Sequence, residues 1–176
     1  FLYSYVYNYM EDLRLRKSFN LKNGLFWFIL FLSIVFSIFS FADICDKTLS
    51  GTILQKFTHS NAAHLLSNMV VFNFVLTTFD NTYDKSTTYR IVLFSFAINV
   101  LVVWTLRYHM NLECSIGFSG IIFSLLSYII LKTRGLNSDS LIWILSLSIP
   151  PLLITNTSFS GHFIGILCGI ILYLIY

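Results

Sequence analysis

Residues 140–176 read SLIWILSLSIPPLLITNTSFSGHFIGILCGIILYLIY, without a single Asp, Glu, Lys or Arg. A helix that crosses a bilayer needs about 20 apolar residues, so this stretch is too long for one crossing. Pro150-Pro151 and residues 156–158 are the helix-breaking points within it. We therefore expect two crossings here, over 141–153 and 161–176.

The composition of the whole chain also indicates a membrane protein. Of its 176 residues, 56% are apolar and only 11% are charged. A soluble domain has about 25% charged residues, so an ordinary soluble protein is excluded and the lipid bilayer is the expected environment. The net charge is only +3, and no basic cluster is interleaved with aromatic residues. Nucleic acid is therefore not an expected partner.

Four further uncharged runs precede this stretch, each bounded by charged or turn residues. They cover residues 25–42, 57–79, 91–106 and 114–131. Together the six runs predict an all-α membrane protein, a six-helix transmembrane bundle over residues 25–176. Residues 1–24 are polar, aromatic and basic, so we expect a cytosolic N-terminal segment rather than a cleaved signal peptide.

The distribution of basic residues sets the expected orientation, because cytoplasmic loops collect Lys and Arg. With the N-terminus inside, eight of the 11 basic residues are cytosolic. These are Arg14, Arg16, Lys17, Lys22, Lys85, Arg90, Lys132 and Arg134. The outer loops then keep Lys47, Lys56 and Arg107. We therefore expect both termini in the cytosol, in a membrane that the sequence does not name.

Polar residues inside membrane helices are costly and by default mark a functional site. They occur here in three places, near the starts of the second, fourth and sixth predicted helices. The three groups are His59, His64 and Asn68; Gly117, Phe118, Ser119 and Gly120; and Gly161, His162, Gly165 and Gly169. In the assigned orientation all three lie at the same depth, just below the outer surface. A helix that begins at residue 114 would place Ser119 about 7 to 8 Å below its start.

This layer contains the groups needed for nucleophilic attack on an amide. A serine hydroxyl is a weak nucleophile unless a base takes its proton, and a neutral imidazole suits that role. Ser119 and His162 can form this pair. His64, Asn68 and the Ser119 backbone N–H can stabilise the oxyanion, and Gly117 can adopt a backbone conformation that other residues resist. No Asp or Glu is placed to orient His162, which predicts a dyad rather than a triad.

These motifs resemble those of the rhomboid family of intramembrane serine proteases, whose core is a six-helix bundle. The resemblance rests on H-x4-H-x3-N at 59–68, on G-x-S-G at 117–120 and on H-x-x-G-x-x-x-G at 162–169, in this order along the chain. It implies Ser119 as nucleophile, His162 as general base, and His64 with Asn68 as oxyanion stabilisers.

The resemblance also implies a substrate that is itself a transmembrane segment of a single-span membrane protein, cut near its outer end. One departure concerns the residue four positions after the nucleophile. Many active relatives have tyrosine there and this chain has Phe123, which retains stacking on the histidine but lacks the hydroxyl.

Other interpretations of the same residues are also available. A catalytically silent rhomboid-like protein that binds transmembrane helices for trafficking or quality control would share the bundle, although such relatives usually lose the serine or the histidine. A small transporter is disfavoured, because the chain has no internal repeat and no pair of broken helices.

The remaining histidines and cysteines give weaker signals. The chain has neither H-E-x-x-H nor C-x-x-C, so we expect no zinc site and no other cofactor. Cys45 and Cys114 both fall on the outer side, which leaves a disulfide open. His59 either shapes the site or lies in a wet interfacial loop, and His109 is expected to be solvated in an outer loop.

Overall fold

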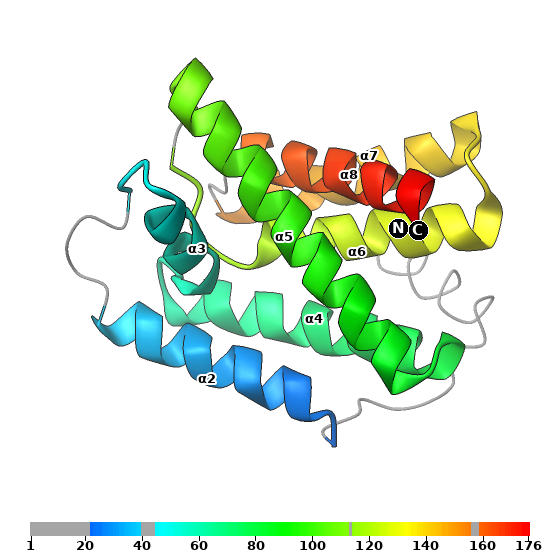
Figure 1. The fold of residues 1–176 in the computed structure, drawn as a ribbon, viewed down its shortest axis with the longest axis horizontal. Coiled ribbons are helices and arrows are strands. Elements are labelled where there is room, and N and C mark those ends of the chain that lie inside the picture. Colours follow the sequence, from blue (N-terminus) through cyan, green and yellow to red (C-terminus); the bar gives the residue numbers. More distant parts are fainter. Residues whose placement is uncertain (1–21, 40–44, 113, 156–158) are drawn as a thin grey trace.

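The computed structural model describes residues 22–39, 45–112, 114–155 and 159–176. These residues form seven α-helices and no strand, which confirms the expected all-α class (Figure 1). The helices are α2 (Gly24–Phe39), α3 (Leu49–Phe57), α4 (Ala62–Thr82), α5 (Lys85–Met110), α6 (Ser119–Arg134), α7 (Ser138–Thr155) and α8 (Phe159–Ile175).

Helix α6 lies at the centre of the bundle. Its residues from Ser119 to Leu131 are all buried except Leu126. A helix that is apolar on every face is typical of one surrounded by other helices. Helices α4, α5, α7 and α8 pack against it (Figure 1), so the nucleophile proposed from the sequence lies at one end of the most enclosed helix.

The contact between α6 and α8 is close because glycines line it. A methyl group added at Gly165 would lie against the carbonyl oxygen of Gly120, and one added at Gly169 would lie against that of Ser124. Small residues allow helix backbones to approach closely in membrane proteins. The Ser124 hydroxyl also accepts a hydrogen bond of 2.9 Å from Ser95 on α5. The stripe of small residues therefore sets the position of α8 against α6.

The second predicted helix begins later than the sequence indicates. The apolar run starts at Phe57, but Phe57 ends the short helix α3, and α4 starts at Ala62. Asn61 causes this break: its side chain caps α4 by accepting a hydrogen bond of 2.8 Å from the His64 backbone N–H. The predicted boundary at residue 57 is therefore wrong.

The fourth predicted helix is also shorter at its outer end. Helix α6 starts at Ser119 rather than at residue 114. Gly117 has a φ of +107°, which is incompatible with a right-handed helix and interrupts the run. Ser119 therefore occupies the first position of its helix, and the expected depth of about 7 to 8 Å below the helix start is wrong.

The third and fifth predicted helices are longer than expected. Helix α5 extends to Met110, which places Arg107 and His109 in its last turn rather than in a loop. Arg107 is 2% exposed, although we expected a basic residue of an outer loop. The backbone of α7 remains helical through Pro150-Pro151 to Thr155. Helix α7 ends at Thr155 and α8 begins at Phe159, and the break predicted at residues 156–158 lies outside the described residues.

Among the residues that the structure describes, two helices, α4 and α5, are long and apolar enough to cross a bilayer by themselves, while α2 and α8 are apolar but shorter. On the opposite side of the bundle from the starts of α4, α6 and α8, Asn23 donates a hydrogen bond of 2.8 Å to Asp80 and so joins the start of α2 to the end of α4.

Candidate active site

Three helices begin on the same side of the bundle, and each has a predicted site residue in its first turn. Figure 1 shows α4, α6 and α8 running in one direction from that side. His64 is the third residue of α4, Ser119 the first residue of α6 and His162 the fourth residue of α8. All three side chains are therefore at one end of the bundle, and all three are at most 9% exposed.

The turn at Gly117 lies directly against two of the predicted site residues. A methyl group added at Gly117 would lie 2.9 Å from His64 Cε1, 3.1 Å from His64 Nε2 and 3.3 Å from Asn68 Nδ2. Both nitrogens are buried, and neither has a hydrogen-bond partner among the described residues. Two unpaired polar nitrogens therefore converge on a glycine two residues before Ser119.

The other ring nitrogen of His64 has a hydrogen-bond partner. His64 Nδ1 lies 3.2 Å from the Ser60 hydroxyl. When this hydroxyl donates to Nδ1, the proton of the neutral ring is on Nε2. The Nε2 atom then becomes a hydrogen-bond donor, like the Asn68 amide, and both donors are directed at the Gly117 turn.

The start of α6 adds a further donor. The first N–H groups of a helix have no intrahelical partner, and no side chain caps this helix at Phe118. The helix dipole gives this end partial positive charge. The Ser119 backbone N–H is thus available, together with His64 and Asn68, to an oxygen that acquires negative charge.

His162 lies over the ring of Phe123. The two ring centroids are 4.4 Å apart with an interplanar angle of 32°, so Phe123 holds one face of the imidazole. His64 is also close enough to His162 to interact with it electrostatically. Within the described residues, His162 Nδ1 has no partner and no hydrogen bond joins His162 to the Ser119 hydroxyl.

Comparison with known proteins places this arrangement in a family. The model of the Rhomboid domain matches residues 46–176, which is most of the chain. The chain belongs to the rhomboid family. A protein of Acanthamoeba polyphaga mimivirus, described as a putative rhomboid protein, is 26% identical over 132 residues, and the match covers 68% of this chain and 70% of the viral protein.

Membership makes this rhomboid an integral membrane protein with intramembrane protease or rhomboid-like function. Rhomboid proteins act on membrane protein substrates within the bilayer. The resemblance of the sequence motifs to this family is therefore confirmed.

Several neighbours of the site in this rhomboid were not predicted from the sequence. Ser60 contacts the His64 ring, Asn61 caps the helix that bears it, and the Gln55 carbonyl accepts the Gly117 N–H at 2.8 Å. Ser60-Asn61 before an apolar run is a helix-start signal that could have revealed the first two. No local pattern identifies Gln55, because it meets Gly117 only through the fold.

The other two histidines, His59 and His109, lie in different surroundings. His59 is 6% exposed, and its ring centroid is 5.1 Å from that of His64 in an edge-to-face arrangement. It therefore packs against the site rather than lying in a wet loop. His109 is on α5 and contacts Tyr108 at a centroid distance of 5.0 Å.

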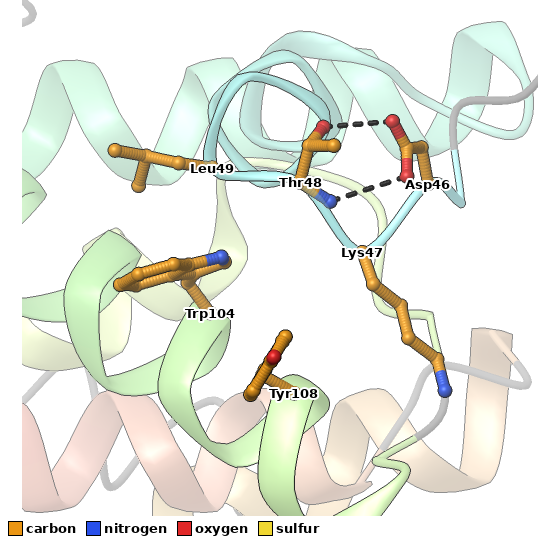
Figure 2. A pocket seen from close by; sticks show the side chains of 6 residues that line it. All are labelled: Asp46, Lys47, Thr48, Leu49, Trp104 and Tyr108. Carbon is orange, nitrogen blue, oxygen red and sulfur yellow. Dashed lines mark hydrogen bonds between the residues drawn. The ribbon is translucent and has the colours of Figure 1, made fainter.

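A separate surface pocket lies between the start of α3 and the end of α5. Figure 2 shows its lining side chains, which are Asp46, Lys47, Thr48, Leu49, Trp104 and Tyr108. None of them belongs to the predicted site. Among the described residues of this rhomboid, no group of three potential metal ligands comes together.

Proposed function

We propose that this rhomboid is an intramembrane serine endopeptidase that cleaves transmembrane segments of single-span membrane proteins near their outer ends. The observation that supports this most directly is the pair of buried, unpaired nitrogens of His64 and Asn68 beside the Gly117 turn. Buried polar groups are nearly always paired. In the proposed reaction, an oxygen of the substrate is the hydrogen-bond acceptor for these two nitrogens.

In the proposed reaction, Ser119 Oγ attacks the carbonyl carbon of the scissile bond while His162 takes the hydroxyl proton. The carbonyl oxygen becomes negative and accepts hydrogen bonds from His64, Asn68 and the Ser119 N–H. Collapse breaks the C–N bond, and His162 gives its proton to the leaving amine. Water then hydrolyses the ester by the same steps, with His162 as base.

Within the described residues no hydrogen bond joins Ser119 to His162, and this is compatible with the scheme. Catalytic hydrogen bonds are often long in the absence of substrate and shorten in the complex. A substrate helix must also unwind to present its carbonyl to Ser119. We therefore expect small or helix-breaking residues near the outer end of a substrate to favour cleavage.

We also propose that both termini, including the segment 1–24 before the bundle, are cytosolic, so that the site opens to the outer face. Two observations support this orientation. Lys56 and Arg107, two of the three basic residues assigned to the outer side, are each 2% exposed, which leaves that surface nearly free of positive charge. Cys45 and Cys114 on this side form a disulfide, as is typical of an oxidising compartment.

The test uses the reconstituted protein with fluorescent single-span substrates and a fluorophosphonate probe. We expect the wild type to cut and to be labelled, and Ser119→Ala to lose both. Ser127→Ala is the matched control, because its hydroxyl is on the same helix without a described partner, and it should retain both activities. A folded wild type that neither cuts nor is labelled would favour the helix-binding, catalytically silent alternative.

A further inference from the structure

A covalent link joins the segment before α3 to the segment that leads into the nucleophile. Cys45 and Cys114 form a disulfide across 69 residues of sequence, with their Cα atoms 5.5 Å apart. Cys114 is three residues before Gly117, whose turn contacts His64 and Asn68. The disulfide therefore restrains one end of the loop that ends at Ser119.

Arg107 supports the same segment from α5. Its guanidinium donates hydrogen bonds to the carbonyl oxygens of Cys45, at 2.7 Å, and Asp46, at 3.0 Å. Its side chain is 2% exposed, and a buried charge is tolerated only where acceptors are provided. The planar guanidinium can reach two carbonyls at once, which a lysine ammonium cannot do with the same geometry.

Helix α3 passes this restraint on to the Gly117 turn. The Gln55 side chain donates to the Asp46 carbonyl at 3.3 Å, and the Gln55 carbonyl accepts the Gly117 N–H at 2.8 Å. Thr48 caps the start of α3 by accepting from the Gly51 N–H at 3.0 Å. The Gly117 turn is thus held through α3 by hydrogen bonds and through Cys114 by a covalent bond.

We infer that Arg107 is a positioning residue for the proposed reaction. It acts together with the Cys45–Cys114 disulfide to hold the Gly117 turn and Ser119 in position. This inference rests on the proposed peptidase function. Neither Arg107 nor the disulfide touches substrate in this scheme. Loss of either loosens the turn, which lowers kcat because a misplacement of about 1 Å can cost about 100-fold in rate.

The disulfide can be tested in the wild-type protein without mutation. Dithiothreitol supplies two electrons and two protons to the Cys45–Cys114 bond, which gives two thiols and the cyclic disulfide of the reagent. The chain has three cysteines, and the third, Cys168, is buried and already reduced, so the reagent acts on one bond. We expect kcat to fall by about 10- to 100-fold with KM changed by less than about twofold.

Variants test Arg107 and the disulfide separately. Arg107→Gln should lower kcat in the same way, and Arg107→Lys should recover only part of it. The double variant Cys45→Ser/Cys114→Ser should have the kcat of the reduced wild type and should not respond to dithiothreitol. Lys47→Ala is the matched control, because it removes an exposed contact with Asn111 between the same two segments and should leave kcat unchanged.

Hydrogen exchange of the Gly117 amide gives a readout that does not require catalysis. We expect faster exchange in a peptide containing Gly117 after reduction and in Arg107→Gln. If reduction makes exchange faster in a wild type that cuts no substrate, the positioning role stands and the peptidase function is rejected. Unchanged exchange, or an unchanged kcat in a cleaving protein after reduction, would overturn the inference.

Discussion

His64 and Asn68 have buried nitrogens that no described residue pairs with. A buried polar group without a partner costs about 1–3 kcal/mol. Both nitrogens face the same glycine, so the cost of these two groups falls at one point. An unpaired donor becomes useful when its acceptor appears only during the reaction, because the interaction then stabilises the transition state more than the substrate.

This explanation predicts separate effects on turnover and on substrate binding. His64→Ala and Asn68→Ala should each lower kcat by about 10²- to 10³-fold, while KM changes by less than about threefold. Steady-state cleavage of a single-span substrate measures both parameters. The control is Ser67→Ala on the same helix, whose hydroxyl only bonds back to the His64 carbonyl. A change in KM alone would assign the two residues to substrate binding.

A second residue-level prediction concerns Gly117. Alanine there is opposed both by the φ of +107° and by contact with His64 Cε1 at 2.9 Å. Gly117→Ala should reduce kcat by at least about 100-fold in a protein that still folds. Gly135 has a φ of +77° but no atom close to an added methyl group, so Gly135→Ala reports backbone strain alone. Equal activity of the two variants would contradict the role of the contact.

The relative positions of the elements depend on where the helices can touch. Helix α8 approaches α6 through Gly165 and Gly169, and α6 in turn lies within contact of α4, α5 and α7. Because Ser119 is on α6 and His162 is on α8, the distance between these two side chains is set by that crossing. In the proposed reaction, stability and catalysis are therefore linked at this helix pair.

Gly169→Ala tests this link. Its methyl group would meet the Ser124 carbonyl oxygen and would lie 2.6 Å from Ser127 Cβ, so the helices must separate. Overpacking of this kind costs about 1–3 kcal/mol. We expect a lower unfolding midpoint in detergent micelles and a lower kcat. Gly24→Ala, where no atom lies within 4 Å, should leave both unchanged. A Gly169→Ala protein as stable as the wild type would argue against the close crossing.

At the scale of the whole molecule, the site and the disulfide share one side of the bundle. This side has one exposed basic residue in the loops assigned to it, Lys47, because Lys56 and Arg107 are buried. Positive charge at the opposite side includes Lys132 and Arg134 in the last turn of α6. This asymmetry is the physical basis for the proposed orientation.

The orientation can be checked by cysteine labelling in sealed cells. Tyr108→Cys is on the proposed outer side and Leu136→Cys on the cytosolic side, and the native side chains are 66% and 50% exposed. A membrane-impermeant maleimide should label Tyr108→Cys in intact cells and Leu136→Cys only after permeabilisation. The native cysteines are paired or buried, so the wild type is the blank. The reverse pattern would invert the topology.

The apolar runs, the all-helical class and the family motifs could all be predicted from the sequence. Each depends on properties of individual residues or on short spacings, such as the absence of charge over 140–176 or the spacing from His64 to Asn68. Hydropathy acts on each segment separately, because every backbone polar group in lipid must be paired within its own helix. The existence of six of the seven described helices therefore needed no knowledge of their neighbours, whereas the short helix α3 was not predicted.

Only the tertiary structure decided where the helices begin and which residues surround the site. Helix α6 starts at Ser119 because the preceding turn is held by Gln55 and by the disulfide to Cys45, far away along the chain. Arg107 carries a charge, which is typical of a surface residue. It is nevertheless buried, because two carbonyl groups of a distant loop accept its hydrogen bonds. Such positions follow from contacts between remote segments, and those contacts exist only once the chain has folded.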